Sequence, residues 1–260
     1  MSDEGFGRLD LHRTVLYGAH TMMNDTDSET PVANPVSRRG FLSTGVKGAV
    51  AATALGAAWP APASAQRTLP FPDTPDAAIR ELLDGNKRFV DKQLNSFNED
   101  LAILKQNTSE KQEPFAALLS CADSRVPVEL VFDQSIGHLF VVRVAGNIAS
   151  SEMIASLEYG AAVLGTKAIL VLGHGSCGAV KATIEGKAVP GQISQLFAPI
   201  RPAIETAGPD LEAAIKANAR IQAKILATAS PLLAGMIKDG KLKIVAGYYD
   251  LARGTVTLLP

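Results

Sequence analysis

Residues 115–125 read FAALLSCADSR, and residues 168–178 read AILVLGHGSCG. Each stretch begins as a short apolar run and then changes abruptly to small and polar residues, which is typical of a buried strand followed by a loop. We therefore predict strands over Phe115–Ser120 and Ala168–Leu172, the second of which is expected to end at Gly173.

The rest of the chain supplies helices and further strands around these two. Leu139–Val144 (LFVVRV) is rich in β-branched residues, and Lys243–Tyr249 and Thr255–Leu259 are predicted to close the chain as two more strands. Helices are predicted over about residues 75–94, 151–164, from 178 to a break at 190–191, 193–206 and 209–230. Strands that alternate with helices in this way predict one α/β domain with a central, mainly parallel sheet flanked by helices.

The N-terminal quarter carries an export pattern. Arg38-Arg39 precedes an uncharged run of small and apolar residues, Gly48–Trp59, which is followed by Ala63-Ser64-Ala65. A basic region, a short apolar region and an A-x-A site in this order are typical of a secretory signal peptide. The arginine pair resembles the twin-arginine signal of bacteria, so we expect export by the twin-arginine machinery to the periplasm or beyond.

This interpretation divides the chain into a signal region, residues 1–65, and a catalytic domain, residues 66–260. The alternative, an apolar core helix, is disfavoured because Pro60 and Pro62 break the chain just beyond the run. Met22 and Met23 lie ahead of the arginine pair, and a second hypothesis places the true start of translation at one of them.

Net charge and the pattern of apolar residues argue against two kinds of partner, nucleic acid and the membrane interior. The net charge of -1 provides no basic surface for nucleic acid. No apolar run approaches the roughly 20 residues that a membrane-spanning helix needs, so no stable membrane span is expected.

The candidate chemistry lies at the ends of the two opening strands. Cys121 follows the first strand, and His174 and Cys177 follow the second. In open α/β sheets, sites form at the carboxyl ends of strands, so these three residues are expected to converge. Two thiolates and one imidazole are a ligand set that suits Zn²⁺. The set leaves a fourth position for water or for the carboxylate of Asp123, which Arg125 could instead hold as a bidentate ion pair.

A different interpretation stays open on cysteine count alone. Cys121 and Cys177 could form a disulfide, which an exported protein would readily keep in an oxidising compartment. The chain would then be a disulfide-stapled exported protein that binds a small anion without catalysis. His138, in a turn, is interpreted as a solvated loop residue.

The two runs CADSRVPVELVFDQSIGHLFVVRVAGN, residues 121–147, and SLEYGAAVLGTKAILVLGHGSCGAVKA, residues 156–182, resemble the β-carbonic anhydrases. The similarity extends from the first predicted helix to the closing YYDLARGTVTLL. The resemblance implies four parallel strands with an added edge strand, and a homodimer or homotetramer. It also implies a zinc lyase that interconverts carbon dioxide with bicarbonate and a proton through zinc-bound hydroxide. Hydrolysis of CS₂ or COS on the same fold is the alternative enzyme activity.

Carried over residue by residue, the resemblance assigns Cys121, His174 and Cys177 as zinc ligands. It assigns Asp123 and Arg125 as the catalytic dyad, with Asp123 as a possible fourth ligand. Gln134, beside Ser135, and Gly175 are expected to bind substrate. The apolar wall of the pocket is expected to include Val126, Val144, Ala145 and Tyr159, the last of these supplied by a partner subunit.

Overall fold

The structure is a computed structural model that describes residues 71–96 and 112–260. The predicted signal region, residues 1–65, and the alternative starts at Met22 and Met23 lie outside the described residues. In the described part of the chain, no helix is long and apolar enough to cross a membrane.

The described elements alternate as the sequence predicts. In chain order they are α1 Pro75–Val90, β1 Ala116–Ser120, α3 Val128–Val131, β2 Leu139–Arg143, α4 Ser151–Ala162, β3 Ala168–His174, α5 Gly178–Glu185, the 3₁₀ helix η1 Ile193–Leu196, α6 Phe197–Ala207, α7 Leu211–Ala229, α8 Pro231–Lys238, β4 Lys243–Tyr249 and β5 Val256–Leu259. Helix α1 begins as expected, because Thr74 Oγ1 accepts a hydrogen bond from Ala77 N and Pro75 takes the first helical position.

The sheet has five strands in the order β2-β1-β3-β4-β5. The first four are parallel, and β5 pairs antiparallel with β4 at one edge. The α/β fold with four parallel strands and an added edge strand is therefore confirmed. Strands β1 and β3 are direct neighbours, which places the two loops with candidate ligands side by side.

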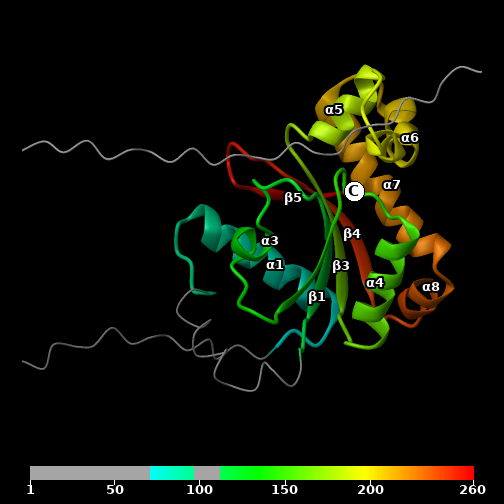
Figure 1. Cartoon of the computed structure of the whole chain (residues 1–260). Helices are drawn as coiled ribbons and strands as arrows, with labels where there is room; N and C mark the ends of the chain where they lie inside the picture. Colours follow the sequence, from blue (N-terminus) through cyan, green and yellow to red (C-terminus); the bar gives the residue numbers. More distant parts are fainter. Residues whose placement is uncertain (1–70, 97–111) are drawn as a thin grey trace, which may run out of the picture. The chain divides into compact units, whose positions relative to one another are not determined.

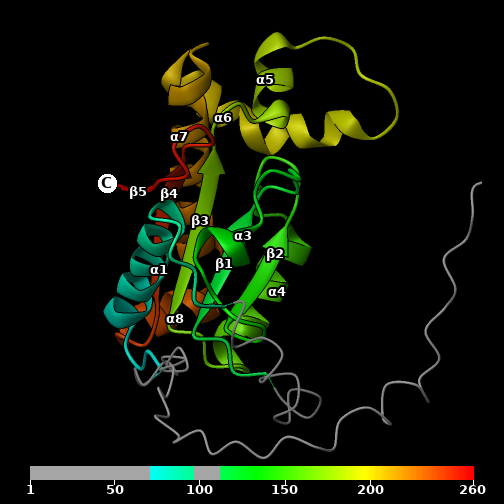
Figure 2. The same ribbon diagram turned by 90° about the vertical axis from the view of Figure 1, so that its left-hand side faces the viewer.

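Helices cover both faces of the sheet (Figure 1), with α1 and α3 on one face and α4, α7 and α8 on the other. Alternate residues of β1 face opposite ways: Leu118 packs under α1, and Leu119 packs under the helices of the other face. A third cluster of buried residues packs α5, α6 and α7 around Cys121 and Cys177. Helices α5 and α6 lie beyond the carboxyl ends of the strands (Figure 2).

The structure differs from the predicted elements in several places, and helix α5 ends at Glu185, ahead of the predicted break at 190–191. Strand β3 does not end at Gly173 but continues through His174, because both residues stay paired with Tyr248 and Tyr249 of β4. Helix α1 ends at Val90 instead of near residue 94. The helix predicted over 209–230 is followed by a separate helix, α8, which Ser230 caps by accepting a hydrogen bond from Leu233 N.

Candidate metal centre

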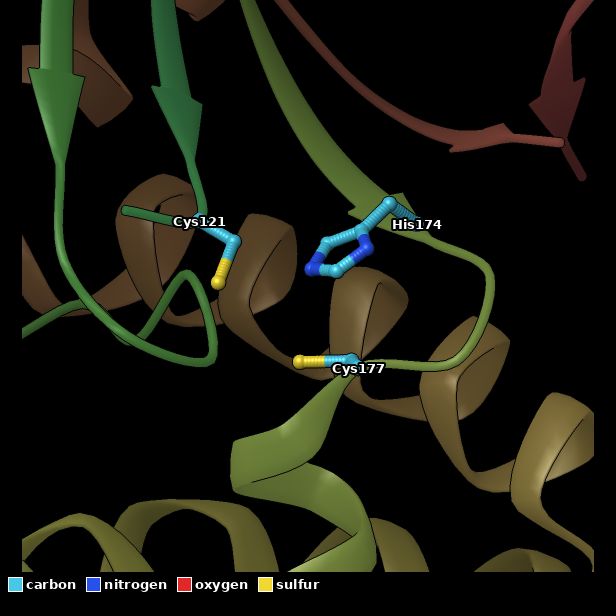
Figure 3. A group of neighbouring side chains, drawn as sticks. All are labelled: Cys121, His174 and Cys177. Atoms are coloured by element: carbon cyan, nitrogen blue, oxygen red, sulfur yellow. The ribbon is translucent and has the colours of Figure 1, made fainter. Parts of the chain in front are cut away.

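Three side chains that were predicted to converge do so at the carboxyl ends of β1 and β3. Cys121 follows β1 directly, His174 is the last residue of β3, and Cys177 caps the N-terminus of α5. Their ligand atoms all lie within 4.8 Å of one another, and all three residues are buried. Figure 3 shows the two sulfur atoms and the imidazole ring facing a common point.

The hydrogen bonding of His174 leaves one ring nitrogen available. Nδ1 lies 2.9 Å from the carbonyl oxygen of Gly175, which can only accept, so Nδ1 carries the proton. Nε2 is then an unprotonated acceptor, and it is buried without a hydrogen-bond partner in the described part of the chain. An orphaned imidazole nitrogen beside two thiol sulfurs fits a soft divalent metal such as zinc.

The two cysteines are free thiols in the structure, so the predicted alternative of a Cys121–Cys177 disulfide is wrong. The Cys177 thiol donates to the Cys121 sulfur, and this hydrogen bond lowers the pKa of Cys121 to about 4. The same hydrogen bond, together with burial, raises the pKa of Cys177. Both thiols have to be deprotonated before one metal ion can bind both sulfur atoms.

Asp123 and Arg125 form the bidentate ion pair that the sequence suggested. Arg125 donates from Nε to Asp123 Oδ1 at 2.9 Å and from Nη2 to Oδ2 at 2.7 Å. These hydrogen bonds hold the pKa of the Asp123 carboxyl well below its usual range. Asp123 Oδ2 lies 3.8 Å from His174 Nε2, so the carboxylate borders the three candidate ligands.

A second arginine supports the same loop, and the sequence analysis missed it. Arg143, at the end of β2, donates to the backbone oxygens of Cys121 at 3.0 Å and Asp123 at 2.6 Å. A signal was present, because Arg143 is the one charge in the run LFVVRV and β2 is the neighbour of β1. The backbone N–H of Gly146, three residues further, donates to Cys121 Sγ at 3.3 Å.

The predicted substrate-binding residues lie in two different places. Gly175 is part of the metal loop, and its N–H donates to Tyr249 O at 2.9 Å. Gln134 is buried beside α1, where its amide donates to Glu81 Oε1 and to Phe132 O. Tyr159 is on α4 and is 48% exposed. Their roles toward substrate stay predictions.

Fold and site together define a class: an α/β protein with a buried Cys₂His ligand set at the carboxyl ends of parallel strands. Comparison with known proteins gives the family. The family model described as "Carbonic anhydrase" matches residues 116–256. A carbonic anhydrase of Mycolicibacterium smegmatis is 36% identical over 71% of this chain and 93% of its own length.

Two further relatives agree. Carbonic anhydrase 2 of Mycobacterium tuberculosis is 33% identical over 72% of this chain and 95% of its own length. A Coccomyxa β-carbonic anhydrase, solved in complex with acetazolamide, superposes with a TM-score of 0.54 at 25% identity, over 68% of this chain and 84% of that one. This chain belongs to the β-class carbonic anhydrase family.

Proposed function

We propose that the chain is an exported zinc enzyme that interconverts carbon dioxide and bicarbonate. The observation that carries this proposal is the convergence of Cys121, His174 and Cys177 in a protein of this family. Two cysteine sulfurs and one histidine nitrogen are ligands that zinc prefers. The Nε2 atom of His174 has no hydrogen-bond partner in the described part of the chain, as expected for an atom that binds a metal.

Cys121, His174 and Cys177 would hold the metal, and a fourth position would stay open. When bound, zinc would supply Lewis acidity, which lowers the pKa of a coordinated water to about 7. Asp123 is ionised because Arg125 donates to both of its oxygens, so it acts only as an acceptor. In this role Asp123 orients a water molecule for attack on carbon dioxide, and Arg125 keeps the carboxylate in place.

Export and assembly belong to the same proposal. The arginine pair, the apolar run and the A-x-A site support transport by the twin-arginine machinery to the periplasm. This route carries folded proteins, which would allow the metal to bind before export. The family supports a homo-oligomer as the working form.

The first experiment measures zinc per chain and the rate of CO₂ hydration for the full chain and for Cys177→Ser. We expect one zinc per chain in the wild type, and loss of both metal and activity in the variant. Ser176→Gly is the matched control, because Ser176 is exposed on the same loop and its φ of 55° suits glycine. Bound zinc without CO₂ hydration at any pH would reject the proposal in favour of CS₂ or COS hydrolysis.

Export is tested by cell fractionation of a bacterium that expresses the chain. The double substitution Arg38→Lys with Arg39→Lys should leave the protein in the cytoplasm, whereas the wild type should reach the periplasm and begin at Gln66. Equal periplasmic amounts of both would reject the twin-arginine route.

A further inference from the structure

A pair of fully buried amides lies on the inner face of α7. Asn218 and Gln222 are one helical turn apart and both have no exposed surface. Gln222 Nε2 donates to Asn218 Oδ1 at 3.1 Å. The polar atoms of a buried amide are nearly always hydrogen-bonded. The other hydrogen-bond partners of Asn218 and Gln222 therefore show which parts of the chain these two side chains hold together.

Those partners lie chiefly on the segment between β2 and α4. Asn218 Nδ2 donates to Gly146 O at 2.9 Å, and Gln222 Oε1 accepts from Ala149 N at 2.9 Å. Gln222 Nε2 also donates to Pro199 O in α6 at 3.0 Å. The two amides therefore clamp the segment around Gly146 against α7 and α6.

The clamped segment has a conformation that needs support. Gly146 and the following Asn147 both have positive φ, 77° and 45°. A side chain at Gly146 would meet Ile200 Cδ1 at 2.7 Å, so the backbone lies directly against α6. Gly146 also donates its N–H to Cys121 Sγ at 3.3 Å. One residue is thus held by Asn218 through its carbonyl and contacts a candidate metal ligand through its amide.

We infer that Asn218 and Gln222 are positioning residues, which hold the Gly146 N–H on the Cys121 sulfur and thereby tune that sulfur as a metal ligand. An N–H···S hydrogen bond withdraws electron density from a thiolate and fixes its direction. Removing a group that hydrogen-bonds to a metal ligand commonly lowers metal affinity by about 10–100-fold. This inference rests on the proposed metal site.

The test uses the full chain loaded with Co²⁺ in place of zinc, because cobalt thiolates absorb in the near ultraviolet. Asn218→Leu is compared with Asn86→Leu. Asn86 is a matched control, since it is also a buried asparagine on a helix. It donates to Val131 O and Gly254 O, neither of which belongs to the loops that carry Cys121, His174 and Cys177. We expect the charge-transfer band to shift, and metal loss to a chelator to be about 10-fold faster, in Asn218→Leu alone.

An unchanged band and an unchanged rate of metal loss in folded Asn218→Leu would overturn the inference, and so would equal changes in Asn86→Leu. If Asn218→Leu does not fold, Gln222→Met serves, because it keeps the side-chain length and removes the hydrogen bonds to Ala149 and Pro199. Failure of the proposed function gives a different result, namely a wild type that binds neither metal. Hydrogen exchange of the Gly146 amide in that protein would still decide the inference, with faster exchange expected in the Asn218 variant alone.

Discussion

At the scale of single residues, two arginines hold the Cys121–Arg125 loop in place through different hydrogen bonds. Arg125 holds the carboxylate of Asp123, and its Nη2 lies 3.4 Å from Ser176 O on the other ligand loop. Arg143 holds the backbone oxygens of Cys121 and Asp123. Each task needs two donors in a fixed plane, which a guanidinium supplies and a lysine ammonium does not. Asp123 is therefore fixed through both its side chain and its backbone.

Asp133 shows how the same chemistry can be purely structural. Its side chain is fully buried, and burial favours the neutral acid. Arg88 Nε donates to Oδ2, and the backbone N–H groups of Asn95 and Ser96 donate to Oδ1. These hydrogen bonds outweigh burial, so the pKa of Asp133 is lowered. The ionised carboxylate then ties α1 to the loop that follows α3.

This arrangement predicts a pH-dependent stability. Because the pKa of Asp133 is lower in the folded chain, its contribution is complete above the ordinary carboxyl pKa of about 3.9 and is lost as the pH falls through the folded value. Asp133→Asn, which tolerates the positive φ of 47°, should lower the free energy of unfolding at pH 7 by about 2 kcal/mol, because hydrogen bonds to a charged group are lost. The difference from wild type should shrink below about pH 4.

Urea unfolding at pH 7 and pH 3 measures this effect. The control is Asp76→Asn, because Asp76 forms an exposed ion pair with Lys243 and its loss should leave the transition unchanged. An Asp133→Asn deficit of equal size at both pH values would show that the lost charge is not the cause.

The sequence predicted the residues whose position follows from a strand end, and it missed those brought in by long-range packing. Cys121, His174 and Cys177 each lie within a few residues of a predicted strand, so strand adjacency was enough to join them. Asn218 is 72 positions from Gly146, and nothing in a helical pattern says which loop it faces. The role of Gly146 likewise depends on its contact with Ile200 of α6.

At the scale of elements, the contact between α1 and the end of α3 leaves no room for a side chain. A Cβ at Gly85 would lie 1.8 Å from Phe132 O, which is a backbone atom that no rotamer change can move. On the same helix, Asn86 donates to Val131 O. The backbone of α1 therefore packs directly against the backbone at the end of α3. This contact fixes the position of the loop that contains Asp133.

Gly85→Ala should consequently destabilise the protein by about 3 kcal/mol or more, because the helix must move away from α3. Gly235→Ala is the matched control, since Gly235 is exposed in α8 and has open space around its Cβ position. That change should stabilise the chain by about 0.5–1 kcal/mol through helix propensity. Thermal unfolding of the two variants compares them, and equal shifts of Tm would contradict the packing argument.

Elements were predicted well where apolar periodicity was strong, and boundaries were wrong where tertiary contacts decided them. The five strands and the long helices were found from their patterns. Gly173 was expected to stop β3, yet pairing with β4 carries the strand through His174. This extension places His174 on a strand, which is a more rigid support than the loop the sequence suggested.

At the scale of the whole molecule, the edge of the sheet formed by β2 is apolar. Strand β2 is an edge strand, and its residues from Leu139 to Val141 are only half-buried. Phe140 stacks near Tyr159 of α4, with ring centroids 6.2 Å apart, and Val163 beyond it is 65% exposed. Natural proteins rarely leave an apolar edge strand uncovered, because it pairs readily with other chains. This edge is the surface where we expect a second copy of the chain to dock.

The expected interface yields a prediction about mass in solution. Tyr159→Glu places a charge in the apolar patch and should convert the oligomer into monomers, because an unpaired charge is costly to bury between subunits. Leu232→Glu is the control, since Leu232 of α8 is 46% exposed, close to the 48% of Tyr159, but belongs to another surface. Size-exclusion chromatography coupled to light scattering measures the molar mass of the wild type and of both variants.

Dissociation by Leu232→Glu alone would show that the interface lies at α8, whereas a monomeric wild type would show that no such interface forms. If Tyr159→Glu also reduces CO₂ hydration while keeping its zinc, the partner subunit completes the site, as the family resemblance implies.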